Sequence, residues 1–300
     1  MINLRYHVVS LVAVFLALGV GIVVGSTVIK QGELKTITDN QKRLEGQLSR
    51  TNAENSALSS FLDQSRDQMV RGRLRGVPVL VVATKGVDAK PVQDLHHQLA
   101  VADATDHGTL WFTAKMALRS PGDIAALATL VGTASTDADV VRTAALDKIV
   151  KAASGLAPTS NVLGTMRDAH FLDYSPMPNS PDTLPPTATE TVRVAYVSGA
   201  GAEVGDDLVG LPFIRELGQT PLGAVAVEAG RDTPGGREVF VGLVRKDKTA
   251  VGHVSTVDDL ESWQGQVAAV MALDDLPRFR YGDYGVAPDA KLLLPTPPTP

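Results

Sequence analysis

Three polar side chains that stand close together in the sequence could hold a divalent metal ion. They are Asp103, Asp106 and His107. Carboxylate oxygens and imidazole nitrogens are ordinary ligands of such ions. A polar surface loop would account for the same three residues equally well. These residues are therefore the metal candidates of the sequence, with a solvated loop as the alternative.

The other histidines and the methionines form no recognisable metal motif. His96 and His97 are adjacent, so on a helix they point about 100° apart and cannot make the i, i+4 pair of a helical site. Copper(I) prefers thiolate and thioether ligands. The chain has no cysteine, and its methionines show no Met-x-Met cluster. The residues by themselves therefore assign neither a cofactor nor a copper site.

A glycine-rich stretch at residues 198–205 stands where a phosphate-binding turn belongs, between an apolar strand and a helix. Its glycines run GxGxxxG instead of GxGxxG, and no Walker lysine follows, which favours an ordinary strand-to-helix turn. The sequence contains no GxSxG elbow and no HExxH helix, and the lack of cysteine excludes thiol hydrolases. We therefore expect a protein that is not an enzyme.

The charge balance excludes another class of function. The 300 residues carry a net charge of −5, and the isoelectric point is near 5.7. No strongly basic face follows from this total, so nucleic acid is not an expected partner. The absence of cysteine leaves the redox compartment open, because either side of a membrane tolerates a protein without thiols.

The element that must position everything else is an uncharged run at residues 8–29. As a helix these 22 residues would span about 33 Å, the thickness of a bilayer core. A secretory signal has an apolar region of only about 7 to 15 residues and a cleavage site, so a retained anchor is the favoured interpretation. Long domains translocate largely regardless of flanking charge. We expect residues 1–7 in the cytoplasm and the main domain outside it.

Small residues recur every fourth position within this predicted membrane helix. They are Ala13, Ala17, Gly21 and Gly25. Such a ridge lets two membrane helices approach closely. Small residues are also common in membrane helices, so the pattern could arise by chance. The ridge is a candidate packing surface for a second copy of the chain.

Residues 30–70 change to a seven-residue apolar repeat that predicts a coiled-coil stalk. The predicted core residues are Leu34, Ile37, Leu44, Leu48, Asn55, Leu58, Leu62 and Met69. An asparagine at a single a position, here Asn55, costs stability but fixes register and favours two strands. A homodimer is the simplest outcome. The alternative is a single amphipathic helix that lies on the globular domain.

Residues 77–294 are expected to form one α/β domain. Short apolar runs at 77–83, 110–113, 192–197 and 223–227 alternate with helical patterns, which predicts parallel βαβ units and a Rossmann-like sheet. A further strand is predicted at 238–245. The fold class is thus α/β, with a largely parallel sheet carried outside the cytoplasm on the stalk.

Further strands and helices are separated by segments with a distinctive composition. Residues 71–76 contain three arginines and two glycines and predict a hinge after the stalk. Residues 175–189 hold five prolines and predict an exposed connector. Residues 258–276 predict a helix. The tail at 295–300 is rich in proline and is expected to be extended.

Two stretches at opposite ends of the chain resemble one family. Residues 2–19 and 23–26, together with the block from residue 254 to residue 285, resemble the actinobacterial MctB family, also called copper transport outer membrane proteins. The residues of the C-terminal motif are Ser255, Thr256, Asp258, Asp259, Gly282, Tyr284 and Gly285. Because both ends match in order and at the right separation, the resemblance spans the chain.

The resemblance implies a role in copper efflux or homeostasis at the cell envelope, with copper as the implied ligand. Corynebacterial relatives, the SteB proteins, are linked instead to cell division and envelope assembly with a partner called SteA. A SteB-like scaffold that binds a SteA-like membrane partner is therefore the alternative function. Asp283 stands where a histidine often stands in the family motif. The long apolar helix leads us to expect the cell membrane instead of the outer membrane of the family name.

Overall fold

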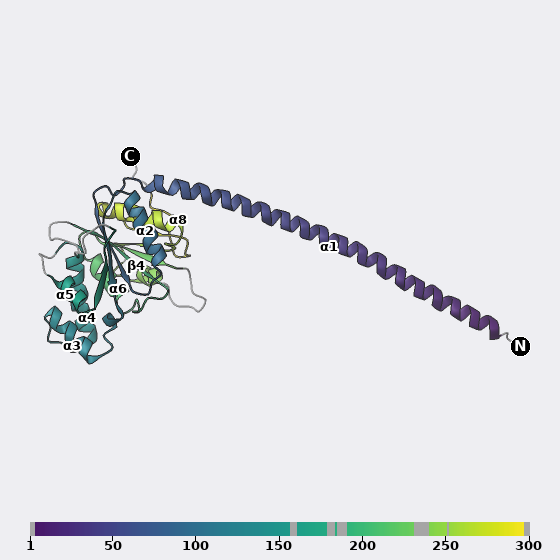
Figure 1. Ribbon diagram of the computed structural model, residues 1–300, viewed down its shortest axis with the longest axis horizontal. Coiled ribbons are helices and arrows are strands. Elements are labelled where there is room, and N and C mark those ends of the chain that lie inside the picture. The colour runs from purple at the N-terminus through teal and green to yellow at the C-terminus, as the bar shows by residue number, and fades with distance from the viewer. Residues whose placement is uncertain are drawn as a thin grey trace. The chain divides into compact units, whose positions relative to one another are not determined.

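The structure is a computed structural model that describes residues 4–156, 161–178, 184, 191–230, 240–250 and 252–296. The chain divides into two compact units, residues 1–61 and residues 62–300. The first unit is helical and the second has an α/β fold, and each is described by itself (Figure 1).

Helix α1 (Leu4–Val70) is a single uninterrupted helix. Its apolar part, Tyr6–Gly25, has a mean hydropathy of 2.8 and, among the described residues, is the one stretch long and apolar enough to cross a membrane. This finding confirms the single apolar N-terminal helix, close to the predicted 8–29. The helix continues through residues 30–70, as the stalk requires. Pairing of this helix with a second chain stays a prediction.

The last turns of α1 belong to the α/β unit. Val70 is fully buried, and Met69 packs against one of the two core clusters of this unit. The Arg66 guanidinium donates to Gln266 Oε1 over 3.1 Å. Met69 was assigned to the coiled-coil core, so this assignment is corrected: its side chain is used by the α/β core of its own chain.

The predicted hinge at 71–76 is a turn held against the domain. Leu74 is fully buried, and its backbone N–H donates to Ala102 O over 2.9 Å. The Gly76 N–H donates to Asp103 O over 2.9 Å. Gly72 and Gly76 have φ values of +70° and +68°, a conformation that glycine adopts at little cost. The segment is therefore a packed connection.

Seven strands form one sheet in the order β3-β2-β1-β4-β5-β6-β7. Every neighbouring pair is parallel except β2 and β3, which are antiparallel. This arrangement confirms the mostly parallel sheet. The strands are β1 (Pro78–Thr84), β2 (Thr105–Phe112), β3 (Leu172–Ser175), β4 (Arg193–Gly199), β5 (Ala224–Ala229), β6 (Val254–Val257) and β7 (Asp283–Tyr284).

Helices cover both faces of the sheet, so alternate residues of a strand enter different cores. On β1, Leu80 and Val82 join one cluster, whereas Val79 and Val81 join the other. One face carries α2 (Ala89–Val101) and α8 (Trp263–Asp275). The opposite face carries α3 (Pro121–Val131), α4 (Ala138–Ala153), α5 (Val162–Asp168), α6 (Gly210–Gly218) and α7 (Phe240–Lys246), as Figure 1 shows for most of them. Two short 3₁₀ helices, Ala114–Ala117 and Leu276–Arg278, complete the elements.

The strand predicted at 238–245 is wrong. Residues 240–246 form helix α7, and residues 238 and 239 lie outside the described part of the chain. Phe240, Val241 and Val244 are buried on one side of this helix. An apolar run of this length fits either a buried strand or a helix face, and packing on the sheet selects the helix.

Other boundaries also differ from the sequence predictions. The helix predicted at 258–276 starts at Trp263, because Ser262 caps it by accepting from the Gly265 N–H over 3.1 Å. Strand β3 ends at the first residue of the predicted connector 175–189, most of which lies outside the described residues. Most of the proline-rich tail, residues 297–300, also lies outside them.

Candidate functional site

The C-terminal motif gathers around Arg245, a residue of α7. Its side chain is only 5% exposed. Nε donates to Thr256 Oγ1 over 2.9 Å, and one terminal nitrogen donates to Asp258 Oδ2 and to the Tyr284 carbonyl, each over 2.9 Å. The other terminal nitrogen donates to Asp289 Oδ1 over 2.7 Å. Arg245, Thr256, Asp258 and Tyr284 are named the motif cluster from here on.

Asp258 is the acceptor at the centre of this cluster. Its Oδ1 accepts from the backbone N–H of Val286 over 2.6 Å and of Ala287 over 3.2 Å. Gly285 has a φ of +128°, and a Cβ there would lie 2.1 Å from Asp258 Oδ1. Only glycine therefore lets the chain turn tightly around this carboxylate. The motif residues Asp258 and Gly285 form one structural unit.

The remaining motif residues hold the strand and helix ends in place. The Gly282 N–H donates to Ser255 Oγ over 3.4 Å. A Cβ at Gly282 would lie 2.5 Å from the Tyr284 hydroxyl oxygen. Asp259 has a φ of +65°, and its carboxylate accepts from Gln264 Nε2 over 3.1 Å. These residues thus shape the entry into α8.

Asp283 is the residue that stands where the family motif often has histidine. Its Oδ1 accepts from Thr256 Oγ1 over 3.0 Å, and its Oδ2 lies 2.6 Å from Lys291 Nζ. The carboxylate is therefore engaged by an ion pair and a hydroxyl. The residues present suit a cation-paired acid at this position, so the motif supplies no imidazole ligand here.

One buried acid, Glu228, lies in β5 near the motif cluster, and the half-buried Asp206 lies near it in the loop after β4. Glu228 accepts from the Val241 N–H over 3.1 Å, and burial raises its pKa from 4.5 to about 7. The nearby charges of Asp206 and Asp258 add to this rise in pKa. Asp206 accepts from Ser198 Oγ over 2.5 Å, and its pKa is also raised by burial. Glu228 can therefore hold a proton near neutral pH.

Glu228, Asp206 and Arg245 belong to none of the motifs recognised in the sequence. Glu228 could have been noticed as the one charged residue in the otherwise apolar β5 (Ala224–Ala229). A glutamate is rarely buried unless it is paired. Arg245 offered no such signal, since it reaches the motif only through the packing of α7. The cluster thus contains one residue that lies outside the recognisable motif.

The predicted metal candidates are not brought together as a site. Asp106 Oδ2 lies 2.6 Å from His96 Nδ1, and Asp103 Oδ2 lies 3.4 Å from Arg75 Nε. His107 accepts a hydrogen bond at its backbone carbonyl from the Tyr174 hydroxyl over 2.8 Å. Among the residues that the structure describes, no group of three or more histidine, aspartate and glutamate side chains could hold a metal ion. The metal site at Asp103, Asp106 and His107 therefore gains no support from the described residues and stays a prediction.

His96 links Asp106 to a threonine in the order of a catalytic triad. Its Nδ1 contacts Asp106, and its Nε2 lies 2.7 Å from Thr109 Oγ1. Thr109 is only 2% exposed and belongs to strand β2, which pairs on both sides. A nucleophile needs access to its substrate, and this hydroxyl has none. The three side chains instead fasten α2 to β2.

The glycine turn at 198–205 closes against another loop. Gly86 and Gly201 have φ values of +91° and +89°, and a Cβ at Gly86 would lie 2.1 Å from Gly201 O. The Glu203 N–H donates to Lys85 O over 2.7 Å. Strand order reverses between β1 and β4, where doubly wound folds bind ligands. Here the two loops fill that position, which agrees with an ordinary turn.

The first unit presents two exposed surfaces on α1. One contains the small residues Ala13, Ala17 and Gly21, all exposed, and half-buried Gly25. A Cβ at Gly21 or Gly25 would meet no atom within 4 Å. The other surface carries Leu44, Leu48 and Leu58, which are 59%, 62% and 56% exposed. The side chains of Leu34 and Ile37, also assigned to this surface, lie outside the described part.

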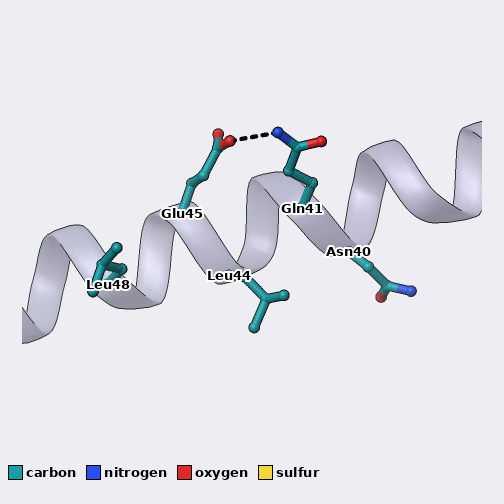
Figure 2. Close-up of a pocket in the computed structure, with 5 residues that line it drawn as sticks. All are labelled: Asn40, Gln41, Leu44, Glu45 and Leu48. Carbon is teal, nitrogen blue, oxygen red and sulfur yellow. Dashed lines mark hydrogen bonds between the residues drawn. The ribbon is translucent and has the colours of Figure 1, made fainter.

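A shallow concave patch lies on this second surface. Its lining residues are Asn40, Gln41, Leu44, Glu45 and Leu48. Figure 2 shows Gln41 and Glu45 on one flank, where Gln41 Nε2 donates to Glu45 Oε1 over 2.9 Å, and Leu44 projecting on the other flank. Leu44 and Leu48 thus remain uncovered beside polar side chains.

The family described as "Copper transport outer membrane protein, MctB" matches residues 1–295. The chain belongs to the MctB family. The match includes the apolar helix, the α/β domain and the motif cluster. This match confirms the resemblance of residues 2–26 and 254–285 to the MctB family.

Relatives in mycobacteria carry the same family name. The protein called "Copper transporter MctB" in Mycobacterium tuberculosis (strain ATCC 25618 / H37Rv) is 27% identical over 301 residues, covering 92% of this chain and 93% of the relative. The protein of that name in Mycobacterium leprae is 28% identical over 311 residues, covering 95% and 96%. This MctB-family chain is therefore similar to both relatives along nearly its whole length.

Proposed function

We propose that this MctB-family protein acts in copper efflux or homeostasis at the cell envelope as a membrane-anchored protein that is not an enzyme. The observation that carries the proposal is the family match over residues 1–295, which includes the anchor and the motif cluster. The relatives are named copper transporters. In the proposed topology residues 1–7 face the cytoplasm, and the α/β domain lies outside it.

In this proposal copper passes through an assembly that the protein supports, and the chain itself does not bind copper(I) tightly. The chain has no cysteine. Met116 and Met166 are fully buried in one apolar core, and Met271 lies in the other. Asp258, the central acid of the family motif, is engaged by Arg245 and by backbone N–H groups. These features favour a structural role for the motif over a ligand role.

The proposal is tested by deleting the gene under copper stress and measuring cellular copper by elemental analysis. Deletion should raise cellular copper severalfold, and the full chain should restore the wild-type level. A variant without residues 8–29 should not restore it, because the domain would lose its place at the membrane. Zinc measured in the same samples is the control for specificity. Unchanged copper in the deletion strain would contradict the proposal.

A SteB-like scaffold in cell division or cell-wall assembly is the second candidate. The exposed leucines Leu44, Leu48 and Leu58 favour it, because a row of uncovered apolar side chains is typical of a protein-binding surface. A SteA-like membrane partner is the expected ligand in this case. Deletion should then disturb septation while cellular copper stays constant. Affinity purification of the full chain would recover cell-wall enzymes in this case and metal-efflux proteins under the first proposal.

A further inference from the structure

One exposed surface of α1 is named the heptad seam from here on. It is formed by Gln41, Leu44, Leu48, Thr51, Asn55 and Leu58. These residues occupy the a and d positions of the repeat. We propose that a second copy of this chain docks on the heptad seam in parallel and in register, as a two-stranded coiled coil. The proposal goes beyond the copper role and does not depend on it.

Most of the residues that line the concave patch have the heptad positions of a coiled-coil hole. In a parallel two-stranded coil each d side chain inserts as a knob into a hole made by four residues of the facing helix, at positions a, d, e and the next a. Four of the five residues that line the patch occupy these positions: Gln41, Leu44, Glu45 and Leu48. Leu44 of a second copy therefore fits the hole around Leu44 of the first.

The flanks of the heptad seam are compatible with this arrangement. In a parallel register each g residue faces the e residue of the next heptad on the other copy. The resulting pairs are Asn40 with Glu45, Gln47 with Asn52 and Glu54 with Ser59. None of them places like charges together. Arg50 Nε lies 2.9 Å from Glu54 Oε1 on the same helix. This ion pair keeps the Arg50 charge away from the seam.

Asn55 selects the register. With both copies aligned, the two Asn55 side chains face each other and can share a hydrogen bond. A shift by one heptad would place Asn55 against Leu48 or Leu62 and leave a buried amide without a partner, which is unfavourable. The neighbouring d residue Leu58 is 56% exposed and continues the apolar contact. One polar layer within an apolar seam thus defines a single alignment.

The small-residue ridge of the apolar span does not belong to the same interface. Leu48 follows Gly21 by about 7.5 turns at 3.6 residues per turn, so the two residues lie on opposite sides of a straight helix. The same interval separates Ala17 from Leu44. A dimer closed along the heptad seam would therefore leave Ala17 and Gly21 facing away from the partner copy. In this proposal the ridge makes a separate contact, and its pairing with a second copy stays a prediction.

Cysteine cross-linking of the full chain in native membranes tests the proposal, because the natural chain contains no cysteine. Leu44→Cys and Leu58→Cys place thiols at d positions, where two Cα atoms of a parallel dimer come within about 7 Å, the reach of a disulfide. Gly46→Cys is the matched control, because it lies two residues away on the outer side of the same helix. Mild oxidation with diamide should link both d variants into a dimer at least tenfold more than the control.

Two results would overturn the inference. One is equal cross-linking of Leu44→Cys and Gly46→Cys, which would indicate random collision. The other is no cross-linking of either d variant, as expected if the α/β domain of the same chain or another protein covers the seam. Gly21→Leu combined with Leu44→Cys should leave the linked fraction unchanged. A severalfold loss in this double variant would place the ridge within the interface and contradict the proposed face.

Discussion

Arg245 is the residue on which the geometry of the C-terminal motif depends most. It is almost fully buried and donates to Thr256, Asp258, Asp289 and the Tyr284 carbonyl. Removing one partner of a buried ion pair leaves an uncompensated charge, which costs about 3 to 5 kcal/mol. A neutral residue at position 245 is therefore expected to destabilise the motif cluster.

The first prediction is that Arg245→Ala lowers the free energy of unfolding of the α/β domain by about 3 to 5 kcal/mol. Urea unfolding followed by fluorescence measures it, because both tryptophans, Trp111 and Trp263, lie in this domain. Arg215→Ala is the control. Arg215 pairs with Asp247 but is 43% exposed, so its loss should cost about 1 kcal/mol or less. An equal loss of unfolding free energy in the two variants would contradict the central role of Arg245 in the motif cluster.

The second prediction concerns Glu228, whose pKa is raised from 4.5 to about 7. The folded state binds this proton more tightly than the unfolded state, so the contribution of Glu228 to stability falls as the pH rises from about 4.5 and levels off above about 7. Glu228→Gln removes this loss. The variant should match the wild type near pH 4 and exceed it by roughly 3 kcal/mol at about pH 8. Thermal unfolding of both proteins across this pH range checks the prediction. A stability difference between variant and wild type that stays constant with pH would refute it.

At the level of single residues, the sequence alone identified the motif through Asp258, Gly282 and Gly285 but not what these residues do. Their roles follow largely from contacts between residues far apart in the sequence, such as Gly285 against Asp258, 27 positions away. Arg245 and Glu228 join the site only when α7 packs on β5 and β6. For the metal candidates, closeness of Asp103, Asp106 and His107 in the sequence likewise did not form a group of three ligands among the described residues.

Among the elements, the helix α1 was the most predictable and α7 the least. Length and apolar composition alone define the span Tyr6–Gly25, because no long-range contact is needed to satisfy its backbone. The seven residues of α7 are too short for periodicity to separate helix from strand. Strands β3 and β7, with four and two residues, are held by pairing with neighbours and give little signal of their own.

The third prediction belongs to α1. Asn55→Leu should raise the thermal stability of the paired heptad seam while relaxing the preference for two strands, because a polar layer costs stability and specifies the oligomer. Analytical ultracentrifugation of the full chain in detergent should give one dimeric species for the wild type and a mixture that includes larger species for the variant. A monomeric wild type at tens of micromolar would contradict the paired seam.

For the whole molecule, the fourth prediction is the topology. Protease added to intact spheroplasts should degrade the chain beyond about residue 30 and leave a small membrane-embedded fragment. Permeabilised cells, in which the protease reaches both sides of the membrane, are the control. Protection of the α/β domain in intact spheroplasts would reverse the orientation. A mature N-terminus beyond Gly25 would identify the apolar span as a cleaved signal.

As a membrane-anchored support for copper transport, the chain itself is expected to hold no tight copper(I) site. Titration of the full chain with copper(I) against a competing chelator in detergent measures this property. The chain lacks thiolates, and three of its methionines are buried in apolar cores. The chelator should therefore keep the copper throughout the titration. A single stoichiometric site of sub-nanomolar affinity would contradict the claim and identify a dedicated copper-binding protein.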